Sequence, residues 1–253
     1  MKYIISFALK NIPRKYLQLF SHFGLQIVGL FYAGNKVVCP ISGKKYRKFL
    51  PYGRKARENA LSPGSLSLER HRLMWLYLKE KTNFFTANLK VLHIAPEYCF
   101  IDRFTKMNNL QYITADLESP LAQIKMDIHE MPFQENEFDV VFCNHVMEHV
   151  EDDTKAMREI LRVLKPGGWA IIQSPLELDR ETTFEEKSLK TPKERQRVFG
   201  QDDHVRAYGK DYGKRLEGAG FKVKVDSYNQ ELDDTVRKKY GLPEYEDLYV
   251  CYK

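Results

Sequence analysis

One stretch, residues 137–175, constrains the fold more than any other part of the chain. An apolar run ends at the polar residues Asn144 and His145, helical periodicity follows over 152–164, and a Pro-Gly-Gly break leads into a second apolar run. Short apolar runs without polar alternation are typical of strands buried on both faces of a parallel sheet, with the helix as crossover. Ligands of such sheets bind beyond the carboxyl ends of the strands, so residues 144–149 are expected at the rim of a site.

Three motifs in this stretch occur together in a fixed order. They are Phe138-Asp139-Val140-Val141, Glu148-His149 and Arg162-Val163-Leu164-Lys165-Pro166-Gly167-Gly168. In this order and spacing they resemble the fourth-strand to fifth-strand region of class I S-adenosylmethionine-dependent methyltransferases, in particular the methyltransferase-11-like subgroup. The resemblance implies an α/β, Rossmann-like sheet of seven strands with the last strand antiparallel, and S-adenosylmethionine as the cofactor. We expect this domain over residues 83–253.

The charge of the chain is divided unevenly. Residues 1–81 hold 16 Lys or Arg against three acids, a balance of +13, whereas the net charge of the whole chain is +6. A basic N-terminal extension, residues 1–82, therefore precedes an acidic domain and favours an anionic partner such as RNA, a phosphosugar or a membrane surface. A solvated surface of mixed charge is the alternative. Four scattered cysteines without a paired framework favour a reducing, cytoplasmic setting.

The extension contains two recognisable segments. Residues 1–33 are expected to form an amphipathic helix that packs on the body; the apolar part is too short to span a bilayer, and peripheral membrane contact is the alternative. Cys39, Ser42, Ser62 and Ser65 are spaced like the ligands of two zinc knuckles, but serine is a poor zinc ligand. The sequence predicts a degenerate zinc-ribbon-like element without metal, or a coincidence of spacing in a loop rich in Gly and Ser.

Basic and aromatic residues alternate between these two knuckles. Tyr46, Phe49 and Tyr52 stand among Lys and Arg residues, a pattern that can bind nucleic acid or sugar phosphate but is generic. A helix is expected from Ser67, its N-cap, to Lys81.

The first strand of the main domain, residues 90–94, leads into an unusual loop. His93, Ala95 and Glu97 stand where the resemblance would place an acidic residue and two glycines, so the loop has no glycine for positive φ. These three residues are expected to hold the methionine end of the cofactor. Because the loop departs from the family pattern, a protein without catalytic activity is an alternative.

The ends of the next strands supply the other candidate cofactor residues. Asp116 ends the second strand about twenty residues after the first loop, the separation expected of an acid that binds ribose hydroxyls. The resemblance implies that Asp127 accepts from the adenine amino group with Ile128 against the ring, and that the rim of the fourth strand flanks the cofactor. The predicted cofactor residues are His93, Ala95, Glu97, Asp116, Leu117, Asp127, Ile128, Asn144 and His145.

His145, Glu148 and His149 also satisfy the pattern H-x-x-E-H of inverted zincins. That pattern requires a long helix, and here a buried strand precedes it, so we predict no metal ligands. The alternative comes from the resemblance: some quinone-pathway methyltransferases hold a divalent ion near the substrate with a Glu-x-x-Glu-His motif, in which His145 here would replace the first Glu. Glu148 is expected to cap or orient the loop, with His149 packed beneath it.

The polar stretch 174–206 resembles the place where class I enzymes carry substrate-recognition insertions. His204 is the predicted general base, because a neutral imidazole can take a proton near pH 7. Arg206 is predicted to fix an anionic substrate. A cap and salt-bridge cluster at the start of the next helix is the alternative.

Together these features predict transfer of a methyl group to an O or N nucleophile of a small-molecule or glycan acceptor. The alternatives are a non-catalytic module that binds cofactor, RNA or glycan, and an rRNA methyltransferase that uses the basic extension. The sequence does not distinguish among acceptors.

Overall fold

The computed structural model describes residues 24–53 and 56–253, which form two compact units. The first unit contains the described residues up to Phe85 together with Tyr98–Arg103 and Tyr228–Glu246; the second contains Thr86–Glu97, Phe104–Ser227 and Asp247–Lys253. Both units are therefore assembled from separate segments of the chain. The expected N-terminal helix lies mostly outside the described residues, although residues 24–31 are helical.

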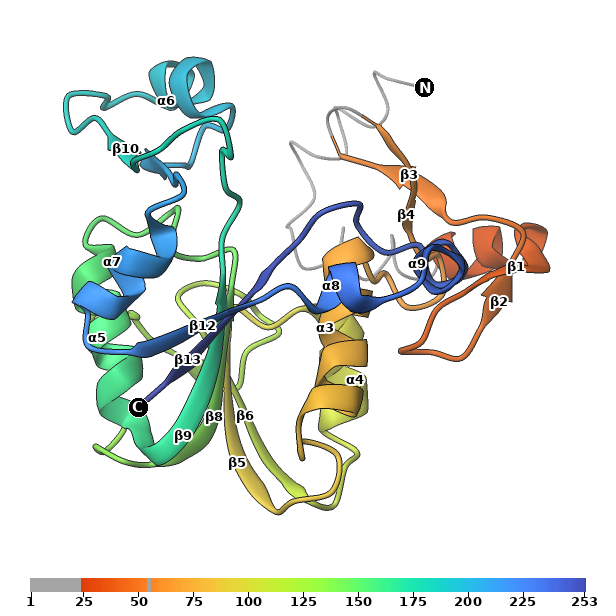
Figure 1. Ribbon diagram of the computed structural model, residues 1–253, viewed down its shortest axis with the longest axis horizontal. Coiled ribbons are helices and arrows are strands. Elements are labelled where there is room, and N and C mark those ends of the chain that lie inside the picture. Colours follow the sequence, from red (N-terminus) through yellow and green to blue (C-terminus); the bar gives the residue numbers. More distant parts are fainter. Residues whose placement is uncertain (1–23, 54–55) are drawn as a thin grey trace. The chain divides into compact units, whose positions relative to one another are not determined.

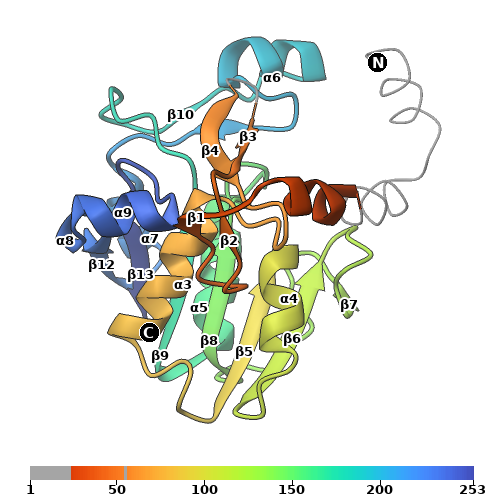
Figure 2. The ribbon, with the colours of Figure 1, turned by 90° about the vertical axis from the view of Figure 1, so that its right-hand side faces the viewer.

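A seven-stranded sheet forms the centre of the second unit (Figure 2). Its strands are β5 (Leu89–Ile94), β6 (Leu110–Asp116), β7 (Ile124–Lys125), β8 (Phe138–Asn144), β9 (Leu164–Gln173), β12 (Lys222–Asp226) and β13 (Leu248–Tyr252). The order is β12-β13-β9-β8-β5-β6-β7. Strands β5 to β9 are parallel, and β13 is antiparallel to both β9 and β12. The predicted sheet with an antiparallel last strand is confirmed.

The apolar runs that dominate the sequence form the middle of this sheet. Residues Val140 to Cys143 of β8 are fully buried, as are Ala170 to Ile172 of β9. The crossover between them is α5 (Asp153–Val163), whose N-cap Asp152 accepts a hydrogen bond from the Lys155 main-chain N–H at 2.9 Å. Helices α5 and α7 (Tyr212–Gly218) lie side by side on one face of the sheet (Figure 1).

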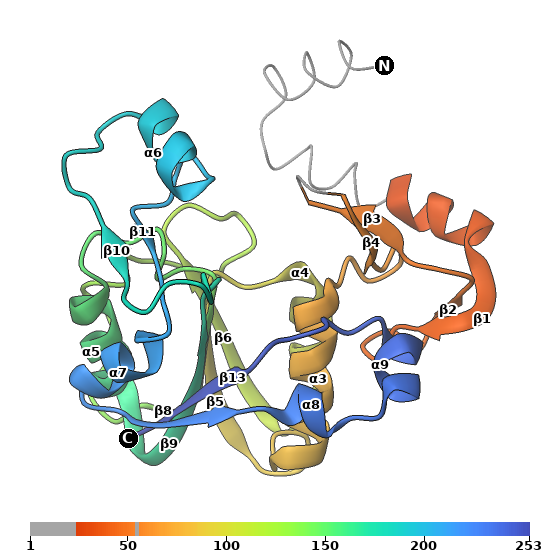
Figure 3. The same cartoon turned by 45° about the horizontal axis from the view of Figure 1, so that its top comes forward.

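The polar stretch after β9 contains a small substructure of its own. Strands β10 (Phe184–Glu185) and β11 (Arg206–Ala207) pair antiparallel, and α6 (Pro192–Phe199) lies between them in sequence (Figure 3). The Thr191 hydroxyl accepts from the main-chain N–H of Glu194, whose carboxylate accepts from that of Thr191, a capping box that fixes the start of α6. The predicted insertion is thus an ordered hairpin that carries a helix.

The first unit contains two short hairpins and several helices. Strand β1 (Ala33–Val38) pairs with β2 (Lys45–Tyr46), and β3 (Leu50–Tyr52) pairs with β4 (Arg57–Leu61). The helices are α3 (Glu69–Lys81), α8 (Tyr228–Glu231) and α9 (Asp234–Tyr240), with α4 (Tyr98–Phe104) beginning in this unit. Ser67 was expected to cap α3, but the N-cap is Leu68, because the Ser67 hydroxyl is bonded to Ser65 and Cys39 instead.

The side chain of Arg72 joins three parts of this unit. Its buried guanidinium donates to the main-chain carbonyls of Ala60 and Ser67 at 2.9 and 2.7 Å and to those of Tyr240 and Gly241 at 2.6 and 2.5 Å. Burial lowers the pKa of Arg72 to about 10. Residues more than 160 positions apart in the sequence are thereby held together.

The two knuckle-like turns have the same backbone hydrogen bonds. The main-chain N–H of Cys39 donates to Lys44 and that of Gly43 to Cys39, at 3.0 and 2.8 Å. At the second turn, Ser62 donates to Ser67 and Leu66 donates to Ser62, at 2.9 and 2.8 Å. Gly43 and Leu66 also share positive φ, +72° and +59°. The pattern is therefore repeated in conformation as well as in spacing.

The side chains of these turns bond to one another. The Cys39 Sγ lies 3.1 Å from Ser65 Oγ and 3.4 Å from Ser67 Oγ, and the two hydroxyls are 2.9 Å apart. Burial raises the pKa of Cys39, but hydrogen bonds from Ser42, Ser65 and Ser67 outweigh it and bring the pKa below its ordinary value. We call Cys39, Ser42, Ser65 and Ser67 the hydroxyl cluster.

Candidate functional site

The loop after β5 adopts the conformation for which a glycine was expected. Ala95 has φ of +50°, and its main-chain N–H donates to the carbonyl of Ala115 at 2.9 Å. A left-handed conformation costs a non-glycine residue about 1–2 kcal/mol, so the neighbouring strand must hold it in place. The loop has lost its glycines in sequence but has kept a left-handed turn at this position.

The side chains around this loop form a buried chain of hydrogen bonds. His93 is fully buried, with Nδ1 2.7 Å from the Tyr112 hydroxyl and Nε2 2.5 Å from Glu97 Oε2. The other carboxylate oxygen of Glu97 accepts from Asn144 Nδ2 at 3.1 Å. Three predicted cofactor residues, His93, Glu97 and Asn144, are therefore brought together at the carboxyl ends of β5 and β8.

Asp116 ends β6 and is half-buried. One of its carboxylate oxygens, Oδ1, accepts from the main-chain N–H groups of Glu118 and Ser119 at 2.7 and 2.6 Å. These bonds fix the direction of the carboxylate. Leu117, the residue that follows, is 56% exposed.

Asp127 and Ile128 follow the short strand β7, which ends at Lys125 and not at Ile128 as predicted. Asp127 is exposed, and its Oδ1 accepts from the main-chain N–H of His129 at 2.8 Å and lies 2.7 Å from His129 Nδ1. Those hydrogen bonds lower the pKa of Asp127 below its ordinary value. Ile128 is buried in the core.

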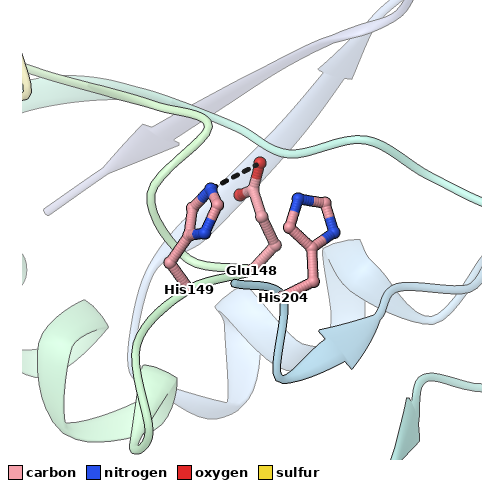
Figure 4. Close-up of side chains that lie close together, drawn as sticks. All are labelled: Glu148, His149 and His204. Carbon is pink, nitrogen blue, oxygen red and sulfur yellow. Dashed lines mark ion pairs between the residues drawn. The ribbon is translucent and has the colours of Figure 1, made fainter. Parts of the chain in front are cut away.

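The rim beyond β8 gathers imidazole and carboxylate groups. His145 has φ of +55°, and its main-chain N–H donates to the carbonyl of Gln173 at 2.7 Å. His145 Nδ1 lies 3.3 Å from Glu148 Oε1, and His149 Nε2 lies 4.0 Å from the same oxygen. The ring of His204 meets that of His149 edge to face, with centroids 4.7 Å apart. We call His145, Glu148, His149 and His204 the His–Glu cluster; Figure 4 shows Glu148, His149 and His204.

Glu148 is the one acid among the four residues of this cluster, and its side chain is 2% exposed. Burial raises its pKa, but the hydrogen bond from His145 and the charges of His145 and His149 outweigh burial and lower the pKa of Glu148 overall. Its second oxygen accepts from the Ser174 hydroxyl at 3.0 Å. A buried carboxylate is thus kept ionised at the rim, as an anchor for neighbouring cations or imidazoles.

His204 reaches the cluster from the segment before β11. The residue is 6% exposed, and burial followed by the charge of His149 lowers the pKa of His204 below its ordinary value. The main-chain N–H of the next residue, Val205, donates to the carbonyl of Glu148 at 2.9 Å, which ties the segment to the rim. The H-x-x-E-H motif and His204 are 55 or more positions apart in sequence, and the structure brings them together.

Arg206 is occupied by the protein itself. Its guanidinium donates to the main-chain carbonyls of Met147, Val150 and Glu151 at 2.6, 2.5 and 2.9 Å. Its Nε donates to Glu185 Oε1 at 2.8 Å, and the side chain is 2% exposed. Every nitrogen of the guanidinium therefore donates a hydrogen bond within the protein, and Arg206 holds the rim against β10 and β11. This arrangement agrees with the alternative of a salt-bridge cluster and not with direct contact to an anionic substrate.

A second buried ion pair supports Arg206. Asp153 lies 3.6 Å from Arg206, accepts from Arg215 Nε at 2.6 Å and accepts from the Tyr208 hydroxyl at 2.6 Å. Burial raises the pKa of Asp153, but the hydrogen bonds of Arg215 and Tyr208 outweigh it, and the pKa lies below its ordinary value.

A pocket of about 310 Å³ opens beside these ion pairs. It is lined by both acids and bases, including Glu185, Lys187, Lys190 and Arg195, with Phe199 as an apolar wall. The pocket lies in the ordered insertion, where the resemblance places substrate recognition.

In the first unit, the aromatic residues of the basic segment do not line a surface. Tyr46 and Phe49 are buried, at 3% and 0% exposure, whereas Tyr52 is 46% exposed. Stacking of bases on Tyr46 and Phe49, which the alternating pattern suggested, is excluded because both rings belong to the core. Lys44, Arg47 and other basic side chains of the segment are exposed.

Comparison with known proteins agrees with this geometry. The family described as "Methyltransferase domain" matches residues 83–172. An uncharacterised protein of Methanocaldococcus jannaschii is 31% identical over 155 residues, covering 56% of this chain and 72% of that protein. A ubiquinone/menaquinone biosynthesis C-methyltransferase of Idiomarina loihiensis is 39% identical over 66 residues, covering 26% of this chain and 22% of that enzyme.

A similar fold is found among solved structures. A candidate sarcosine dimethylglycine methyltransferase from Galdieria sulphuraria has a TM-score of 0.51 and 15% identity, with 83% of this chain and 93% of that chain covered. The chain belongs to the class I S-adenosylmethionine-dependent methyltransferase family. It spans only about a fifth of the length of the Idiomarina C-methyltransferase. In the described part of the chain, no helix combines the length and apolar character that crossing a bilayer requires.

Proposed function

We propose that this protein transfers a methyl group from S-adenosylmethionine to an oxygen or nitrogen atom of a small-molecule or glycan acceptor. The observation that carries the proposal is the row of predicted cofactor residues at the carboxyl ends of β5, β6, β7 and β8, with Ala95 in a left-handed turn. Ligands of parallel sheets bind at this edge. Bound S-adenosylmethionine supplies a methyl group on a sulfonium sulfur, which a nucleophile takes by in-line displacement.

The residues of the candidate cofactor site fit the chemical groups of this cofactor. Glu97, held by His93 and Asn144, would face the ammonium of the methionine part, because it follows the turn at Ala95 by two residues. Asp116 is proposed to accept from the ribose hydroxyls through the carboxylate that its turn orients. Asp127 would accept from the adenine amino group, with Ile128 below the ring and Leu117 exposed beside it.

The acceptor is proposed to lie against the His–Glu cluster and the pocket of the insertion. The rim beyond β8 carries His145, which belongs to both the candidate cofactor site and the cluster. Holding the acceptor near attack distance supplies much of the acceleration of such a transfer. Arg206 is proposed as a positioning residue, since its hydrogen bonds keep the segment of His204 on the rim. Four free, buried thiols support a reducing, cytoplasmic setting.

Titration calorimetry with S-adenosylhomocysteine, the product, tests the cofactor site. We expect micromolar binding by the wild-type protein and a loss of about 10–100-fold in Asp116→Ala, because hydrogen bonds to charged groups contribute about 1.5–3 kcal/mol. Glu118→Ala is the matched control, since it removes an exposed carboxylate two residues away. Absence of binding by folded wild-type protein, or equal loss in both variants, would refute the cofactor site.

RNA is a second candidate acceptor, favoured by the exposed basic side chains between β1 and β4. An RNA substrate predicts binding that weakens steeply with salt, with a slope set by the number of phosphates contacted. If the protein bound no RNA at low salt, a small-molecule or glycan acceptor would be favoured over RNA.

A further inference from the structure

The His–Glu cluster holds a set of groups suited to a metal ion. Glu148, His149 and His204 each offer one ligand atom, and these atoms all lie within 4.8 Å of one another. Figure 4 shows the Glu148 carboxylate close to the two imidazole rings, which are in edge-to-face contact with each other. The residues come from two segments, the rim after β8 and the segment before β11, which the Val205 to Glu148 main-chain hydrogen bond joins.

His204 carries a nitrogen that the protein leaves without a partner. Its Nε2 is buried and has no hydrogen bond to any described residue. Buried polar atoms are paired in the great majority of cases, so an exception calls for a ligand or another explanation. An imidazole nitrogen within 4.8 Å of a buried carboxylate oxygen is suited to bind a cation.

The surroundings orient the other two groups as metal sites require. His149 Nδ1 lies 3.3 Å from the main-chain oxygen of Asp203 and 3.4 Å from its carboxylate, which leaves Nε2 directed at Glu148. Metal-binding histidines commonly donate their second ring nitrogen to a carboxylate or carbonyl in this way. The Ser174 hydroxyl fixes Glu148 from the other side.

We propose that Glu148, His149 and His204 bind a first-row divalent ion such as Zn²⁺. Two imidazoles and one carboxylate are ligands that such ions accept, and three protein ligands leave one position open. Around an ion with bonds of about 2.1 Å, tetrahedral ligand atoms are about 3.4 Å apart. Small side-chain rotations would therefore complete the set. The H-x-x-E-H motif alone predicts no metal site, because it does not lie on a long helix. His204, from outside the motif, supplies the further ligand.

The site would also change the role of His204 in the proposed transfer. As a ligand it is no longer a general base; the open position would bind an acceptor hydroxyl, whose pKa the cation lowers so that its proton leaves to water. The acceptor oxygen then forms its bond to the methyl carbon as the bond from that carbon to sulfur breaks. This consequence rests on the proposed function, whereas metal binding does not.

Addition of Co²⁺ to protein freed of metal by chelator dialysis tests the site, because Co²⁺ in a site of low coordination number absorbs visible light. We expect one Co²⁺ per chain, displaced by Zn²⁺, and at least about tenfold weaker binding in Glu148→Gln and in His204→Gln. His129→Gln is the matched control, since it removes an imidazole from outside the cluster, and it should leave the site unchanged.

The proposal would be overturned if folded wild-type protein showed no Co²⁺ absorption band. It would also be overturned if Glu148→Gln or His204→Gln retained the band. Thermal unfolding without metal verifies that each variant folds. Titration with S-adenosylhomocysteine separates this proposal from the proposed function: cofactor binding without Co²⁺ binding refutes only the metal site, and the reverse result refutes only the cofactor site.

Discussion

The hydroxyl cluster of the first unit and the His–Glu cluster of the second both gather ligand-like side chains at one point. In the hydroxyl cluster, Cys39, Ser65 and Ser67 bond to one another, and the turns around them keep their shape through main-chain hydrogen bonds. In the His–Glu cluster, an ionised carboxylate and an unpartnered imidazole nitrogen face each other. Convergence of side chains is common to both, and each region has a buried polar atom without a hydrogen-bond partner among the described residues, Ser62 Oγ at the second turn and His204 Nε2 in the His–Glu cluster. The two regions differ in the chemistry of that atom, because an imidazole nitrogen close to a carboxylate is a good metal ligand and a serine hydroxyl is a poor one.

The largest expected effect comes from giving the two knuckle-like turns of the first unit the zinc ligands that they lack. We expect Ser42→Cys, Ser62→Cys and Ser65→Cys together to create a four-thiolate zinc site with Cys39, because both turns already have the same hydrogen bonds. Structural zinc sites release about 10–16 kcal/mol on binding, so Zn²⁺ should raise the unfolding temperature strongly. The triple alanine variant at the same positions is the control, and equal behaviour of the two would show that the turns are not arranged as knuckles.

Loss of Arg206 should weaken the His–Glu cluster, because Arg206 keeps the segment of His204 on the rim. Arg206→Met breaks the bonds that hold the rim to β10 and β11, and removing one partner of a buried ion pair costs about 3–5 kcal/mol. Urea unfolding should show that loss, and Co²⁺ binding should weaken with it. Arg158→Met, at an exposed arginine of α5, should change neither quantity.

Acid should destabilise the second unit through Asp153. Its pKa is lower in the folded protein than in the unfolded chain, so its contribution to stability is present above about pH 4 and is lost as the pH falls toward the folded value. Each unit of pKa difference corresponds to about 1.4 kcal/mol. Urea unfolding of wild type and Asp153→Asn between pH 7 and pH 3 measures this, and the variant should show the weaker pH dependence; identical slopes would contradict the assignment.

The smallest effect is expected within the hydroxyl cluster itself. Cys39→Ala should cost about 1 kcal/mol, since a net hydrogen bond contributes about that much and the Ser65 and Ser67 hydroxyls keep their mutual bond. Hydrogen exchange of the amides of β1 and β2 measures the change. A chelator should have no effect on these amides, and protection that falls on adding a chelator would mean that this cluster too holds a metal.

Much of the sheet could be predicted, because burial on two faces leaves a direct trace in the sequence. The apolar runs of β8 and β9 and the periodicity of α5 required no knowledge of distant residues. The meeting of His204 with Glu148 and His149 could not be predicted in this way. It depends on the bonds of Arg206 to carbonyls about 55 positions earlier, and β11 is only two residues long.

The loop after β5 shows a different limit. The absence of glycine predicts that positive φ is lost, yet Ala95 adopts positive φ, because its hydrogen bond to Ala115 on β6 holds the turn. Likewise, Tyr46 and Phe49 alternate with basic residues in a pattern that did not reveal their burial. In both cases a tertiary contact decides the outcome.

The order of segments in the two units has a consequence for how the protein is made on the ribosome. Strand β13 lies between β12 and β9, and Arg72 binds the carbonyls of Tyr240 and Gly241. Domains usually fold as units while translation proceeds from the N-terminus. Here, however, the first unit waits for residues near 241, and the central sheet waits for residues 248–252. Nascent chains should therefore expose unfinished edges of both units until residues 241–252 have left the ribosome, which makes that interval the time when a chaperone is most needed.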